Sequence, residues 1–297
     1  MSARPARAWI DLGLLTLCWA SGFTFTAMAL DGFSPEWVVV FRQLAATMLL
    51  VPVVLALSRV RAVPRALWGW LIALATLGNV APFYVISWGQ QHIASGVASI
   101  LVTTMPLMTL ALAHFFIAGE RMTRRRLLGF ATGFAGVVLI VGPEALGRMG
   151  GGGLALAAQL AVLLGAVFFA ANAIVARLMP EMDIWMRSAM VNGLALIIAL
   201  PPAALMAPLP ASFPGWGPVA GVVCTGIFAS AVATVIYFRL IDEAGPTFMS
   251  LTNYMVPPVA LLAGIVVLAE RPDPEALGGL ALILAGMAIA EWRTRTA

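Results

Sequence analysis

The chain of 297 residues contains no lysine, only 10% charged residues and only two cysteines. Soluble domains carry roughly 25% charged residues, so this composition does not fit a soluble globular protein. The mean hydropathy is +0.99, and long stretches carry no charge. Both features predict a protein that lies in a lipid bilayer.

Cysteine and histidine are too few and too scattered for a metal site. Cys18 and Cys224 lie singly in two apolar runs, which excludes a disulfide framework. His92 and His114 are separated, so they form neither a metal site nor a proton relay, and we expect no metal or cofactor. All 17 basic residues are arginines at or near the ends of apolar runs, apart from Arg42. The formal charge of +4 therefore does not indicate a nucleic-acid partner.

Ten continuous apolar runs are each long enough to cross the hydrocarbon of a bilayer as a helix. Strands of a membrane barrel would instead alternate apolar and polar residues over short segments. The sequence therefore predicts an all-α membrane protein with ten transmembrane helices. The predicted spans are 8–29, 36–57, 66–88, 95–117, 124–141, 154–178, 184–205, 216–239, 246–268 and 275–292.

The second half of the chain repeats the first at a spacing of 150 positions. Glu120-Arg121 matches Glu270-Arg271, Gly129 matches Gly279, and Ala135-Gly136 matches Ala285-Gly286. Such a register indicates an internal duplication. We predict one transmembrane domain over 1–297, made of repeat 1 (8–141), a glycine-rich linker (142–153) and repeat 2 (154–292). The first span follows Arg4 and Arg7 as in a signal peptide, but its match to span 154–178 predicts that it is retained.

Arginine placement predicts the orientation. With the N-terminus in the cytoplasm, fourteen arginines fall at the inner side and only Arg148 and Arg271 at the outer side. Five spans per repeat is an odd number, so the second repeat must enter the membrane inverted. Both termini are then cytoplasmic, and we expect a bacterial inner membrane protein.

Inverted repeats with broken helices place a binding site near the bilayer midplane. Pro106, Pro257 and Pro258 are predicted to break the fourth and ninth spans and to free backbone carbonyls. Polar and aromatic side chains on the neighbouring faces are equally explained by contacts between helices. The candidates for substrate binding are Trp19, Phe23, Asn79, Tyr84, Ser99, Thr103, Phe168, Phe169, Asn172, Tyr237, Asn253 and Tyr254.

Charges inside the membrane are few. Every Asp and Glu lies near a span end or in a loop, and Asp11 is the nearest to a span centre. The buried carboxylate that proton coupling generally needs is therefore missing. Arg42 lies about two turns inside its span, where it either snorkels to the surface as a structural residue or holds a substrate carboxylate.

The duplicated layout resembles the EamA-type drug/metabolite transporters. The resemblance rests on two five-helix repeats, each with Gly/Ala-Glu-Arg before a glycine-rich closing helix. It implies an exporter of small metabolites whose helices 1–4 and 6–9 surround a cavity, with helices 5 and 10 outside. The YddG-like aromatic amino acid exporters are the preferred branch. Small multidrug relatives carry a proton-coupling glutamate in the first helix, where this chain has Trp19, Ala20, Ser21 and Gly22.

The sequence thus predicts a monomeric exporter of aromatic and other neutral amino acids, working by facilitative alternating access. Two other carriers remain open: a drug or cation exporter, which would need an anionic cavity, and a nucleotide-sugar or phospholipid carrier, which would need basic residues in a deep pocket. A membrane enzyme would need an acid/base pair, and the scattered acids offer none. If transport proves proton-coupled, Asp11 and His114 are the first residues to test.

Overall fold

The structure, a computed structural model, describes residues 6–116, 123–141, 153–244 and 252–291. All regular secondary structure within these ranges is helical. Seven helices are long and apolar enough to cross a membrane, and three shorter apolar helices accompany them. Large apolar side chains such as Phe115, Leu205 and Val266 are 77–85% exposed. Such an apolar exterior suits a lipid environment, so the chain is an all-helical, multi-pass membrane protein.

The helices follow the predicted spans closely. The ninth span is described from Thr252 onward, because 246–251 lie outside the described residues. In the first half, the helices are α1 (Ala6–Leu30), α2 (Pro35–Ala56), α3 (Arg65–Ala75), η1 (Thr76–Val80), α4 (Ala81–Gln90), α5 (Ser95–Val102), α6 (Met105–Phe116) and α7 (Arg124–Val141). In the second half, they are α9 (Leu154–Leu178), α10 (Ile184–Met206), α11 (Trp216–Cys224), η2 (Thr225–Val232), α12 (Ala233–Ala244), α14 (Thr252–Leu268) and α15 (Pro274–Glu291).

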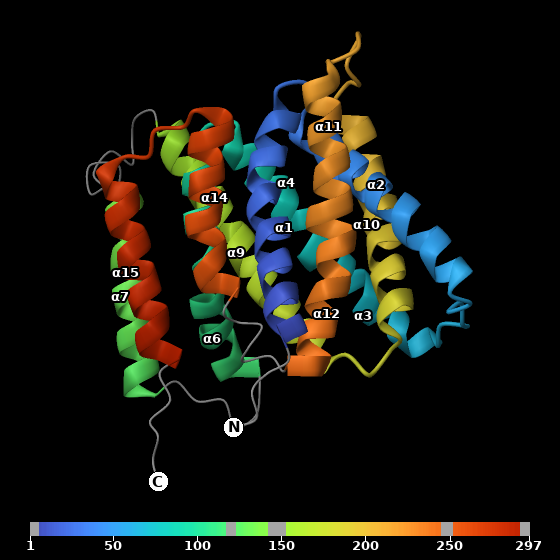
Figure 1. Cartoon of the computed structure of the whole chain (residues 1–297), viewed down its shortest axis with the longest axis horizontal. Coiled ribbons are helices and arrows are strands. Elements are labelled where there is room, and N and C mark those ends of the chain that lie inside the picture. Colours follow the sequence, from blue (N-terminus) through green and yellow to red (C-terminus); the bar gives the residue numbers. More distant parts are fainter. Residues whose placement is uncertain (1–5, 117–122, 142–152, 245–251, 292–297) are drawn as a thin grey trace.

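Helices from the two halves pack against one another. The α1 helix contacts α11, α12 and α14, while α9 contacts α4, α5 and α6. The α2 helix packs on α10, and α7 and α15 form a pair at one edge of the molecule (Figure 1). The described part of α1 begins, and that of α15 ends, at the same end of the molecule (Figure 1). The fold is therefore a single bundle in which each half needs the other for its core.

Three of the membrane spans are irregular near their middle. The π-helices η1 and η2 interrupt the third and eighth spans at positions that overlap under the 150-residue spacing. The fourth span turns at Thr103–Thr104, two residues before Pro106, where the sequence predicts a helix break. In contrast, α14 is continuous through Pro257 and Pro258, so the break predicted there is absent. Both prolines follow the first turn of the described helix, and α2 and α10 also continue through internal prolines. Neighbouring helices in a bundle can stabilise such positions.

Glycines allow α7 and α15 to approach backbone to backbone. A Cβ atom on Gly286 would lie 2.5 Å from the carbonyl oxygen of Gly129 and 2.5 Å from the amide nitrogen of Gly133. A Cβ on Gly136 would lie 2.7 Å from the carbonyl oxygen of Gly279. Small residues at a helix contact allow two helix backbones to approach closely in a membrane. The α7–α15 pair is thus held by its glycines.

We expect Gly286→Ala to lower the melting temperature of the purified protein in detergent. The added methyl group meets backbone atoms that cannot rotate away, and such overpacking costs about 1–3 kcal/mol. Gly69→Ala is the matched control, because a Cβ there has no atom within 4 Å. Equal melting temperatures for the two variants would show that the close contact does not stabilise the pair.

Candidate functional site

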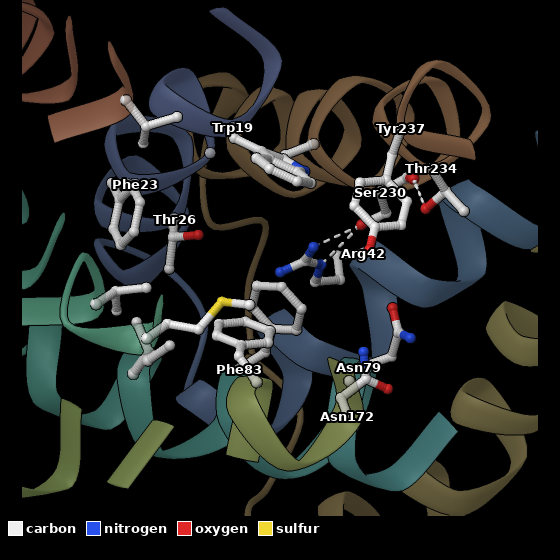
Figure 2. Close-up of a pocket in the computed structure, with 18 of the residues that line it drawn as sticks. Trp19, Phe23, Thr26, Arg42, Asn79, Phe83, Asn172, Ser230, Thr234 and Tyr237 are labelled. Atoms are coloured by element: carbon white, nitrogen blue, oxygen red, sulfur yellow. Dashed lines mark hydrogen bonds between the residues drawn. The ribbon is translucent and has the colours of Figure 1, made fainter. Parts of the chain in front are cut away.

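A cavity of about 270 Å³ lies in the centre of the bundle (Figure 2). Its wall is built by α1, α2, the third span, α5, α6, α9, α10, η2, α12 and α14. Among the described residues, α7 and α15 contribute nothing to it. The site is therefore shared between both halves of the chain, with the glycine-packed pair outside.

Most of the predicted substrate-binding residues line this cavity. Tyr84 does not, because its hydroxyl donates a hydrogen bond to Glu36 at 2.9 Å. Phe168 is also outside the lining, and the side chain of Tyr254 lies outside the described part of the chain. The predicted residues that line the cavity are Trp19, Phe23, Arg42, Asn79, Ser99, Thr103, Phe169, Asn172, Tyr237 and Asn253.

Arg42 is the most distinctive of these residues. Its side chain is only 2% exposed and remains in the cavity wall instead of snorkelling to the membrane surface. Its Nε and Nη2 atoms donate hydrogen bonds to the Ser230 hydroxyl at 3.0 and 2.6 Å. The guanidinium carbon lies 3.3 Å from the ring centroid of Phe83 (Figure 2). The contact with Ser230 joins α2 of the first half to η2 of the second.

The cavity wall is cationic. Its lining includes Arg42 and Arg187, whereas no described Asp, Glu or His takes part in it. Arg42 forms no ion pair with any carboxylate that the structure describes. A hydroxyl dipole and an aromatic face compensate only part of the cost of burying a guanidinium. An anionic group entering the cavity would complete that compensation, while a cation would be repelled.

Five amide side chains line the wall, and two of them, Gln90 and Asn192, donate hydrogen bonds to backbone carbonyl oxygens. The other three are Asn79, Asn172 and Asn253, and none of their side chains hydrogen-bonds to a residue within the described ranges. Each amide offers two donors and an acceptor oxygen. These groups are thus available to a polar ligand.

Aromatic rings form the apolar part of the wall. Trp19 and Tyr237 have ring centroids 5.7 Å apart, and Phe83 and Phe169 are 5.3 Å apart in an edge-to-face contact. Figure 2 shows Phe23 and Trp19 on the side of Arg42 away from Asn79 and Asn172. A small cavity with one apolar side and a few polar groups suits a small metabolite.

The two halves contribute equivalent positions to the wall. The lining pairs that are 150 positions apart are Trp19 with Phe169, Gly22 with Asn172, Phe23 with Ala173, Thr26 with Ala176, Arg42 with Asn192, Asn79 with Ala229, Ser87 with Tyr237, and Thr103 with Asn253. Sequence reasoning missed Phe83, Arg187, Asn192 and Ser230 in the lining. The repeat spacing from Arg42 would have identified Asn192, whereas no comparable signal pointed to Phe83 or Ser230.

The two residues considered for proton coupling lie away from the cavity lining. Asp11 is paired with Arg239, with an oxygen–nitrogen distance of 3.6 Å. His114 lies in the last turn of α6, with its ring centroid 4.9 Å from that of Phe115. Neither side chain faces the site in this conformation.

Comparison with known proteins identifies the fold and the family. A solved crystal structure of another protein is 18% identical in sequence and has a TM-score of 0.68, covering 97% of this chain and 99% of that one. A probable terminal-alkyne amino-acid exporter of Streptantibioticus cattleyicolor is 30% identical over 95% of this chain and 93% of its own length. The uncharacterized inner membrane transporter YedA of Escherichia coli is 24% identical over 84% of this chain and 79% of its own length. The EamA-like transporter family model matches twice, at residues 9–142 and 156–291. The chain therefore belongs to the EamA-like transporter family.

Proposed function

We propose that this protein exports aromatic and other neutral amino acids across the bacterial inner membrane by facilitative alternating access. The observation that carries the proposal is the central cavity, which both halves line and which combines a buried arginine, free amides and aromatic rings. A transporter needs such a site between two parts that can rock against each other.

Two inverted five-helix repeats are the architecture that best accounts for the fold. The family model matches once in each half, with a gap only at 143–155. The π-helices and the paired lining residues repeat at the same 150-residue spacing. The α2–α10 and α7–α15 pairs join equivalent helices, as expected around a two-fold axis. The arginine distribution supports a cytoplasmic location for both termini.

Size and chemistry support an amino acid as substrate. A volume of about 270 Å³ is small for a nucleotide sugar or a phospholipid. The cationic wall opposes an organic cation, which argues against a drug or cation exporter. The S. cattleyicolor relative is named as an amino-acid exporter. In our proposal Arg42 holds the carboxylate, the amides meet the remaining polar groups, and the side chain packs on Trp19 and Phe169.

Uptake of labelled phenylalanine, threonine and methionine into proteoliposomes tests this proposal, with and without an imposed pH gradient. We expect uptake that follows the amino acid gradient and ignores pH, because no described acid lines the cavity. Uptake driven by the pH gradient would contradict the facilitative mechanism and direct attention to Asp11 and His114. Absence of uptake for all three amino acids would contradict the assigned substrate.

We expect Asn79→Ala and Asn172→Ala each to reduce phenylalanine transport by roughly three- to tenfold, because a hydrogen bond contributes about 0.5–1.5 kcal/mol. Initial uptake rates in proteoliposomes would measure the effect. Tyr84→Phe is the control, since it removes a hydroxyl from the same neighbourhood but outside the cavity lining. Unchanged transport in both asparagine variants would contradict their assignment to the site.

A further inference from the structure

We infer that the cavity recognises the carboxylate of its ligand and does not require an ammonium group. Amino-acid derivatives in which the ammonium is absent or neutral, which are organic monoanions with an apolar side chain, should therefore be substrates. The inference rests on the proposed function, because it concerns the same cavity. The observations that support the inference are the charges that face the cavity and the contacts that orient Arg42.

The guanidinium of Arg42 is oriented for a ligand. Its Nε and Nη2 atoms both point to the Ser230 hydroxyl, and Phe83 covers one face. The Nη1 atom makes no hydrogen bond to any residue within the described ranges. An arginine whose side chain is already fixed loses little entropy when a carboxylate binds, and it can offer two parallel donors.

An ammonium group finds no comparable partner. The lining contains no described carboxylate, and its amide oxygens, at Asn79, Gln90, Asn172, Asn192 and Asn253, carry only partial charge. Transfer of an ammonium ion from water into such a site loses hydration that neutral dipoles only partly replace. The positive charge of Arg42 also opposes its entry. The carboxylate thus gains a full opposite charge, whereas the ammonium gains none.

Three ligands of nearly equal shape separate the two groups. Phenylalanine carries both charges, 3-phenyllactate replaces the ammonium with a hydroxyl, and phenylalaninol replaces the carboxylate with a hydroxymethyl group. Isothermal titration calorimetry of the purified, full-length protein in detergent would give the three dissociation constants. We expect 3-phenyllactate to bind at least as tightly as phenylalanine, and phenylalaninol to bind at least about tenfold more weakly.

Each outcome is decisive. Binding of phenylalaninol as tight as that of 3-phenyllactate would overturn the inference. Binding of phenylalanine without binding of 3-phenyllactate would also overturn it, while leaving the proposed function intact. Binding of 3-phenyllactate alone would support the inference and contradict an amino acid as substrate. Absence of binding for all three would contradict both.

Variants add an independent measurement. Arg42→Gln should weaken 3-phenyllactate binding by at least about tenfold and leave phenylalaninol binding unchanged or tighter, because the removed charge attracts one ligand and repels the other. Arg59→Gln is the matched control, since Arg59 pairs with Asp183 outside the cavity lining. Equal weakening of both ligands by Arg42→Gln would indicate a structural role. If that variant does not fold, the three dissociation constants measured on the unmodified protein still test the inference.

Discussion

Proteoliposomes that contain this protein should accumulate 3-phenyllactate roughly 50-fold when the interior is held about 100 mV positive, because one charge moved through 100 mV is worth about 2.3 kcal/mol. The protein returns to its starting state after each transport cycle. The net charge moved therefore equals the charge of the cargo, whatever charges the cavity wall itself carries. Bacteria maintain a negative interior, so the same potential would expel a monoanion and supply a driving force without a proton-binding carboxylate.

Phenylalanine is the control for this prediction, because its net charge is zero at neutral pH and its distribution should not respond to the potential. A potassium gradient with valinomycin sets the voltage, and protein-free liposomes measure leakage of each compound. Equal distribution of 3-phenyllactate at both polarities would contradict electrogenic transport. A response of phenylalanine as large as that of 3-phenyllactate would indicate that another ion moves with the substrate.

Replacement of Glu270 by glutamine should loosen the contact between the second half of the chain and the start of α5. The Glu270 carboxylate accepts hydrogen bonds from the backbone amides of Ser95 at 2.7 Å and Gly96 at 3.1 Å, at the first turn of α5. Its own amide donates to the carbonyl oxygen of Gly264 at 3.1 Å. The residue thus ties the α14–α15 connection in the second half to the start of α5 in the first, and its negative charge suits a helix N-terminus.

Hydrogen exchange measured by mass spectrometry would report this loosening. Hydrogen bonds to a charged group contribute about 1.5–3 kcal/mol, so exchange in α5 should accelerate roughly tenfold or more in Glu270→Gln. Glu275→Gln removes the same charge from an exposed position on α15 and serves as the control. Unchanged exchange in α5 would show that Glu270 does not hold the two halves together at this end.

The position of Glu270 also shows what could be read from the sequence. Its match to Glu120 marked a repeated motif, but no pattern in one chain reveals which helix end a carboxylate will cap. The helical spans were predictable because a membrane demands long apolar runs. The pairing of α7 with α15 was not predicted, because the sequence does not show which helices meet. The continuous α14 was not predicted either, because the sequence does not show which neighbouring helices stabilise a proline.

Part of the cavity lining was predictable from the sequence. Trp19, Asn79 and Asn172 stand out in apolar spans because polar and large aromatic residues are uncommon at mid-membrane. The direction of Arg42 was open between the membrane surface and the interior, since its length permits both. Its contact with Ser230 settles the side-chain direction, and it depends on the packing of α2 against η2. Contacts between residues 188 positions apart are a product of the tertiary fold.

A structure of the protein determined with bound phenylalanine or 3-phenyllactate tests the central claim most directly. We expect the ligand in the central cavity, with its carboxylate within hydrogen-bonding distance of Arg42 and its phenyl ring against Trp19 or Phe169. A ligand bound elsewhere, or one whose carboxylate points away from Arg42, would contradict recognition of the substrate carboxylate by this arginine.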